Sequence, residues 1–137
     1  DTDYWILDQA LERSNSPDLL LAKLRKISID STRIIAVVPN GQHWGLLVSM
    51  TIGDLYDLHY GLINRVPHFW LSFQSVEQLF INAGFTLVRV LPVIRQTLKN
   101  EKIAIGIKQI ACALGVDPDL TLQATQPDLY VIEAVPC

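Results

Sequence analysis

Residues 34–44 read IIAVVPNGQHW, an apolar run that stops at a Pro-Asn pair and is followed by histidine and tryptophan. From Arg33 to Val38 the run is β-branched and apolar without alternation, which is typical of a strand covered on both faces, as in a parallel sheet. Pro39 ends the strand because it has no N–H for the ladder, and Asn40 tolerates turn geometry. The stretch therefore predicts a buried strand followed by a polar turn.

A strand and a helix are expected before this run. Tyr4 to Leu7 is a short apolar segment, and Ser16-Pro17-Asp18 supplies an N-cap residue, a proline at the first helical position and an acid in the first turn. The helix that follows carries its apolar residues on one side, at Leu20, Leu21, Leu24 and Ile27. The order strand, helix, strand predicts a βαβ unit with a right-handed crossover.

The alternation continues after Asn40. We expect a short helix that ends near Gly53 and then an irregular, aromatic-rich segment up to about Leu71. Ser72 is placed to cap the next helix, and Gly84 is placed to end it in the left-handed conformation.

Two further strands are expected in the last third of the chain. The first is TLVRVLPV, residues 86–93, and residues 95–115 after it are expected to be mostly helical. An Asp-Pro turn then leads to LYVIEAV, residues 129–135, whose side chains alternate between two faces. That alternation favours an antiparallel or less buried strand.

Composition limits the classes of function. A chain of 137 residues, 50% hydrophobic and 18% charged, is expected to form one domain over residues 1–137. The net charge of −3 and the absence of a basic run argue against nucleic acid, and no apolar run approaches the roughly 18 to 20 residues that a bilayer requires. With no basic leader at the N-terminus, the expected location is the cytoplasm, with Cys112 and Cys137 as reduced thiols.

Short motifs occur in a definite order between Asp3 and Val90. They are Asp3, Leu11-Glu12, Pro17, Pro39-Asn40, His43-Trp44, Gly61-Leu62 with Arg65, Ser72, and Ala83-Gly84-Phe85. In this order and at these spacings they resemble the second half of a class I S-adenosylmethionine (SAM) dependent methyltransferase, from its fourth strand to its sixth. The resemblance covers about two thirds of the chain, and the closing YVIEA strand is also similar to that group.

The resemblance implies a fold and a site. The fold is an α/β, Rossmann-like methyltransferase half domain with about four strands, mostly parallel with the last one antiparallel, and helices on both sides. Ligands of such sheets bind at the carboxyl ends of the strands. The cofactor SAM would therefore lie near Asp8, Gln9 and Glu12. The methyl acceptor, a small molecule of unknown identity, would lie near Asn40, His43, Trp44, Tyr56, Arg65 and His68.

The chain also departs from the family pattern. It has no Gly-rich turn after a first strand and no acid at the end of a second strand to hold the ribose. Arg13 stands where the family has histidine, and His68 is displaced by one residue from the family position. No catalytic residue is therefore assigned. The three histidines lack metal-ligand spacing, so no metal site is expected.

Two functions remain open at this point. The chain is either the C-terminal, acceptor-side portion of a methyltransferase, inactive as the isolated chain, or a non-catalytic docking or dimerisation module of the same fold. Without the first strands of the fold, the strand from Asp3 to Leu7 would be a bare parallel edge. We therefore expect a homodimer, or a partner that supplies the missing N-terminal half.

Overall fold

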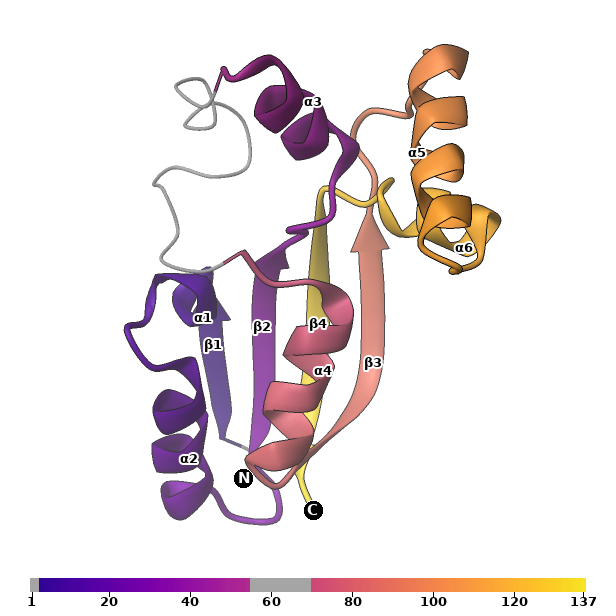
Figure 1. Ribbon diagram of the computed structural model, residues 1–137. Helices are drawn as coiled ribbons and strands as arrows, with labels where there is room; N and C mark the ends of the chain where they lie inside the picture. Colours follow the sequence, from indigo (N-terminus) through magenta and orange to yellow (C-terminus); the bar gives the residue numbers. More distant parts are fainter. Residues whose placement is uncertain (1–2, 55–69) are drawn as a thin grey trace.

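A computed structural model describes residues 3–54 and 70–137 of the chain. Its strands are β1 (Tyr4–Asp8), β2 (Arg33–Pro39), β3 (Phe85–Val93) and β4 (Leu129–Pro136), and they form one sheet in the order β1-β2-β4-β3 (Figure 1). Strand β1 pairs parallel with β2, with Ile6 opposite Ile35. Strand β4 is antiparallel to both of its neighbours, β2 and β3.

The strand directions follow from these pairings. Strands β1, β2 and β3 run the same way and β4 runs against them, so the antiparallel last strand predicted from the alternation of LYVIEAV is confirmed. The position of β4 inside the sheet makes β1 and β3 the two edges. Pro92 lies in edge strand β3, where its missing N–H costs no ladder bond to an outer neighbour.

Six helices are described: α1 (Ala10–Arg13), α2 (Pro17–Ile27), α3 (Trp44–Ile52), α4 (Phe73–Asn82), α5 (Glu101–Ala113) and α6 (Pro118–Ala124). The predicted ends of α3 at Gly53 and of α4 near Gly84 are confirmed, because both glycines have positive φ. The predicted start of α4 is also confirmed, because the Ser72 hydroxyl accepts from the N–H of Ser75. Ser16 occupies the N-cap position of α2, but its side chain makes no capping hydrogen bond.

Two expectations for the C-terminal part need correction. Helix α5 begins only at Glu101, where Asn100 caps it, instead of near residue 95. The Asp-Pro pair expected to form a turn starts α6, because the Asp117 carboxylate accepts from the N–H groups of Asp119 and Leu120 and Pro118 takes the first helical position.

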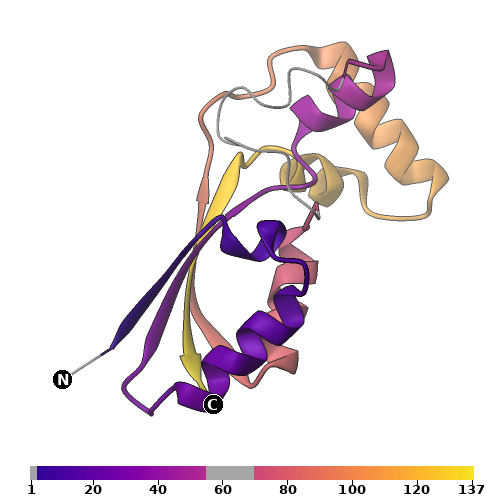
Figure 2. The same ribbon diagram turned by 90° about the vertical axis from the view of Figure 1, so that its left-hand side faces the viewer.

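The helices that contact the sheet lie on one face of it. Helices α1, α2 and α4 stand on the same side (Figure 2), and the main core lies between them and the sheet. Phe80 of α4 and Phe85 of β3 meet there edge to face at 6.1 Å. The expectation of helices on both sides, and of a β2 strand covered on both faces, is wrong for the described residues, since Ile35 and Val37 are only half-buried.

The other face of the sheet is largely apolar and uncovered by any described helix. It carries the ion pair between Arg33 and Glu133, at 2.8 Å, among apolar side chains from all four strands. Those side chains are Tyr4, Ile6, Ile35, Val37, Leu91, Val131 and Val135. At the β1 edge Tyr4 and Ile6 are 63% and 73% exposed, so this edge and face have the apolar character of an interface.

Candidate functional site

The expected site residues that the structure describes follow the carboxyl ends of β1 and β2. Asp8 ends β1 and Gln9 leads into α1, while Asn40 follows β2 and leads through Gln42 to α3. Because these strands are parallel neighbours, their carboxyl ends lie side by side, and both groups of residues lie at that end of the sheet (Figure 1). Tyr56, Arg65 and His68 lie outside the described residues.

Gln9 and Glu12 form the first group. Gln9 has φ 52°, and it is the one non-glycine residue with positive φ in residues 3–54 and 70–137. Backbone in this region is uncommon outside glycine and often occurs at binding sites. The Gln9 N–H donates to the carbonyl of Val37, and its side-chain oxygen accepts from Arg13 at 2.9 Å. The short helix α1 thereby begins at a fixed place beside β2.

Glu12 is the unusual residue of this group. Its side chain is buried, with 3% of the residue exposed, and neither carboxylate oxygen has a hydrogen-bond partner from another residue. Burial raises the pKa of this carboxyl, and the Asp8 carboxylate adds to the rise, while the Glu12 backbone N–H and Arg13 oppose it. A buried carboxyl without a partner is costly, so it is suited to receive a donor or a cation from a ligand.

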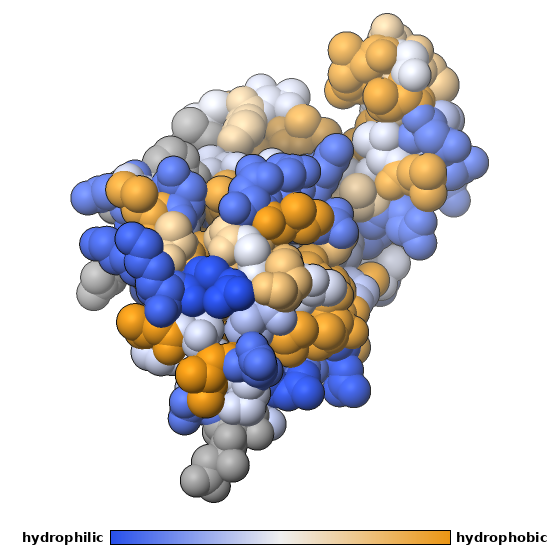
Figure 3. Space-filling view, turned by 90° about the horizontal axis from the view of Figure 1, so that it is seen from below, coloured by the Kyte–Doolittle hydropathy of each residue, from blue (hydrophilic) through white to orange (hydrophobic). Residues whose placement is uncertain are grey.

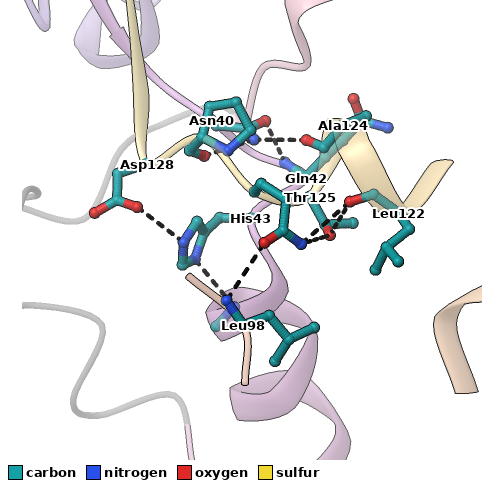
Figure 4. Close-up of polar contacts among 11 residues, drawn as sticks. Asn40, Gln42, His43, Leu98, Leu122, Ala124, Thr125 and Asp128 are labelled. Carbon is teal, nitrogen blue, oxygen red and sulfur yellow. Dashed lines mark hydrogen bonds and ion pairs between the residues drawn. The ribbon is translucent and has the colours of Figure 1, made fainter. Parts of the chain in front are cut away.

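Asn40 forms the centre of the second group (Figure 4). Its amide donates to the carbonyls of Ala124 and Pro127, each at 2.8 Å, and its side-chain oxygen accepts from the N–H of Gln42 at 2.9 Å. The Asn40 N–H also donates to the carbonyl of Asp128. Asn40 thus joins the end of β2 to the segment between α6 and β4, and both amide hydrogens are used within the chain.

His43 is held at both ring nitrogens. Nδ1 accepts from the N–H of Gly45 at 3.0 Å, which caps α3, and Nε2 lies 3.1 Å from the Asp128 carboxylate (Figure 4). With Nδ1 acting as acceptor, the neutral ring carries its proton on Nε2, which faces the Asp128 carboxylate without a well-aligned hydrogen bond. Burial lowers the pKa of His43, and Asp128 opposes that shift. The lowered pKa favours the neutral ring, and the cap at Nδ1 and the Asp128 carboxylate near Nε2 hold it in one orientation.

Trp44 completes this group. Its backbone N–H donates to the carbonyl of Thr125 at 3.0 Å. Its indole ring lies 5.1 Å from the His43 ring, measured between centroids. The indole nitrogen is buried without a hydrogen-bond partner. Buried indole N–H groups usually have an acceptor. This donor is therefore a second place, after Glu12, where a ligand could form a hydrogen bond.

Sequence reasoning missed Asp128 and Thr125. Both lie in the polar segment before β4, and no local pattern distinguishes them from ordinary loop residues. They reach the site only because β4 is placed beside β2, which brings Asp128 to His43 and Thr125 to Trp44. Pairing information, and not composition, would have been needed to find them.

No family model matches this chain, and no curated protein matches it at a significant level. Among residues 3–54 and 70–137, no cluster of three or more His, Cys, Asp or Glu side chains is placed to hold a metal ion. In the same part of the chain, no helix has both the length and the apolar character needed to cross a bilayer.

Proposed function

We propose that this chain forms the acceptor-side half of a SAM-dependent methyltransferase, and that it is inactive unless the other half of the fold is supplied. The buried, unpartnered carboxyl of Glu12 carries the proposal. Glu12 lies just after β1, the first of three strands that run the same way. This is the carboxyl end of the strands, where open α/β sheets bind ligands.

The residues present fit one part of the cofactor. SAM bears an ammonium group, a sulfonium and ribose hydroxyls, and each of these can satisfy a buried acceptor such as Glu12 or a nearby one such as Asp8. The sequence has no Gly-rich turn and no second-strand acid, so the part of the site that would hold the remaining cofactor groups must come from elsewhere. The fit is therefore partial, and weak binding by the isolated chain is expected.

The chain's own residues would act by positioning. When bound, SAM supplies an electrophilic methyl group, whose transfer depends mainly on in-line placement of the nucleophile. The bonds from Asn40 to the backbone before β4, together with the cap at His43, fix the start of α3. The acceptor nitrogen of His43, Nδ1, already accepts from the Gly45 N–H, and Nε2 faces Asp128, so His43 serves as a rigid wall of the acceptor side and not as a general base.

A non-catalytic docking or dimerisation module is the second candidate. The observation in its favour is the exposed β1 edge with Tyr4 and Ile6, next to an apolar sheet face. A strand edge of this kind invites pairing with another chain, and a second copy would pair through the same edge. In this case the polar groups near Asn40 and His43 would serve the fold alone.

Amide chemical-shift mapping of the purified chain with SAM and with S-adenosylhomocysteine tests the choice. The methyltransferase proposal expects millimolar binding, with shifts at residues 8–12, and at least a fivefold loss of affinity in Glu12→Gln. Glu133→Gln is the matched control, since Glu133 lies on the opposite sheet face in an ion pair. Absence of any shift, or shifts that are the same in both variants, would reject the cofactor site.

Sedimentation and an edge variant test the module. A monomer at high concentration contradicts the dimer, whereas a dimer that dissociates in Ile6→Lys supports it, because a lysine on an edge strand opposes pairing. Micromolar SAM binding by the chain alone would contradict the need for another half.

A further inference from the structure

A cavity separates α3 from the α5–α6 pair. It has a volume of about 240 Å³ and is lined by Gly41, Gln42, His43, Leu46, Leu47, Met50, Ile107, Ile110, Thr121 and Thr125. Helices α5 and α6 pack on each other and project beside the sheet (Figures 1 and 2). Figure 3 shows hydrophobic side chains gathered on this projecting part, at the upper right.

The lining is apolar and uncharged. Leu46 and Ile107 are buried in its walls, while Met50 and Ile110 remain about half exposed. No lysine, arginine, aspartate or glutamate is among the lining residues in the described part of the chain. An ion would lose its hydration here without gaining a counter-charge, so a neutral ligand is favoured.

The two threonine hydroxyls of the lining are left with acceptor capacity only. Thr121 donates its hydroxyl hydrogen to the carbonyl of Asp117 at 2.7 Å, and Thr125 donates to that of Leu122 at 2.6 Å. Each threonine oxygen keeps a lone pair that a ligand can use, and Thr125 already accepts from Gln126. His43 Nδ1 accepts from Gly45 and Nε2 faces Asp128, so the polar groups of the lining that are open to a ligand are the oxygen of Thr121 and the side-chain amide of Gln42.

We propose that this cavity binds a small neutral apolar molecule that carries one hydroxyl group, of the size of a two-ring aromatic alcohol. The volume suits this size, since a cavity of roughly 150 Å³ already holds benzene. The hydroxyl donates to Thr121, and the rings lie against Leu46, Met50 and Ile110. This assignment needs no SAM, so it stands or falls apart from the methyltransferase proposal.

Met50 is a natural reporter, because it is the sole methionine of the sequence. With methionine labelled at its ¹³C-methyl group, the spectrum has one such signal, and it comes from the wall of the cavity. Titration with 2-naphthol is expected to shift this signal by ring current. Naphthalene, which lacks the donor, is expected to bind about fivefold more weakly, and 2-naphthoate, which is charged, is expected to leave the signal unmoved.

Two tryptophan variants on α5 provide a matched comparison. Ile110→Trp fills the cavity and should weaken 2-naphthol binding at least tenfold, whereas Ile105→Trp should leave it unchanged. The two isoleucines are 53% and 54% exposed, but only Ile110 lines the cavity. Should Ile110→Trp fail to fold, Thr121→Val replaces it, and the preference for 2-naphthol over naphthalene should disappear while naphthalene binding is retained.

Several results would overturn the assignment. These are an unmoved Met50 signal at saturating 2-naphthol, an equal response to 2-naphthoate, or equal weakening in both tryptophan variants. A Met50 signal that shifts with protein concentration alone would show that a second copy, and not a small molecule, occupies the cavity. SAM is absent throughout, so none of these results depends on cofactor binding.

Discussion

Replacing Asn40 with alanine removes the amide that joins the end of β2 to the segment before β4. The side chain is almost fully buried and makes three hydrogen bonds, to the carbonyls of Ala124 and Pro127 and to the N–H of Gln42. The alanine methyl can replace none of them. The variant therefore takes this partner from two carbonyls and one N–H, and of the three bonds the one to the Pro127 carbonyl is buried.

The expected loss follows from these three bonds. Each contributes about 1 kcal/mol net, so Asn40→Ala should lower the free energy of unfolding by about 3 kcal/mol. With a urea m-value of about 1.5 kcal/mol per M, the unfolding midpoint should fall by about 2 M. Asn40→Asp should be as harmful at neutral pH, since a carboxylate would face two carbonyl oxygens, and should recover in part in acid, where it regains one donor.

Urea unfolding followed by circular dichroism measures this difference. Asn82→Ala is the control, because Asn82 is exposed at the end of α4 and bonds only to Gln78 among the contacts described. The control should change stability by less than about 0.5 kcal/mol. A loss below about 1 kcal/mol in Asn40→Ala would refute the reasoning that the amide holds the two segments together.

Three further predictions concern residues that follow the carboxyl ends of β1 and β2. Burial raises the pKa of Glu12 above its ordinary 4.5, so the folded chain loses stability as pH rises past that value; Glu12→Gln should flatten this part of the urea-midpoint profile and be more stable at neutral pH. Burial lowers the pKa of His43 below 6.5, so the free energy of unfolding should fall as the pH drops through this value. His43→Asn keeps an acceptor that can cap α3 and should remove this pH dependence. An unchanged profile of urea midpoint against pH would assign the dependence to another group. A Cβ on Gly41 would lie 2.9 Å from the Leu71 carbonyl oxygen, so Gly41→Ala should cost about 1 to 3 kcal/mol in thermal or urea unfolding, while Gly106→Ala, in an open helical position, should be neutral or stabilising.

Much of the secondary structure could be predicted because its signals are local. Ser72 caps α4 and Gly84 follows its end as expected, since each of these choices involves only a few neighbouring residues. The Asp117-Pro118 pair carries the same kind of local signal, an N-cap residue followed by a proline at the first helical position, so the turn expected there is wrong. The alternation of the last strand favoured an antiparallel or a less buried strand, and the pairing with β2 and β3 is antiparallel.

The candidate site could be predicted only in part. The expected carboxyl ends of β1 and β2 do carry Asp8, Gln9, Glu12, Asn40 and His43. The burial and the hydrogen bonds of these side chains could not be predicted from the sequence. That the Glu12 carboxyl is buried, and that the His43 ring faces the Asp128 carboxylate, depends on groups that other elements bring close.

The amino-acid sequence by itself determined the four strands and the start of α4 at Ser72, because these depend on periodicity and on caps within a few residues. The insertion of β4 between β2 and β3, the helices on a single face of the sheet and the cavity beside Met50 arose only in the tertiary structure. They depend on contacts between residues far apart in the chain, such as Asn40 with Pro127 and His43 with Asp128. Local pattern carries no information on which distant segment will satisfy a buried polar group, and that choice places the candidate site.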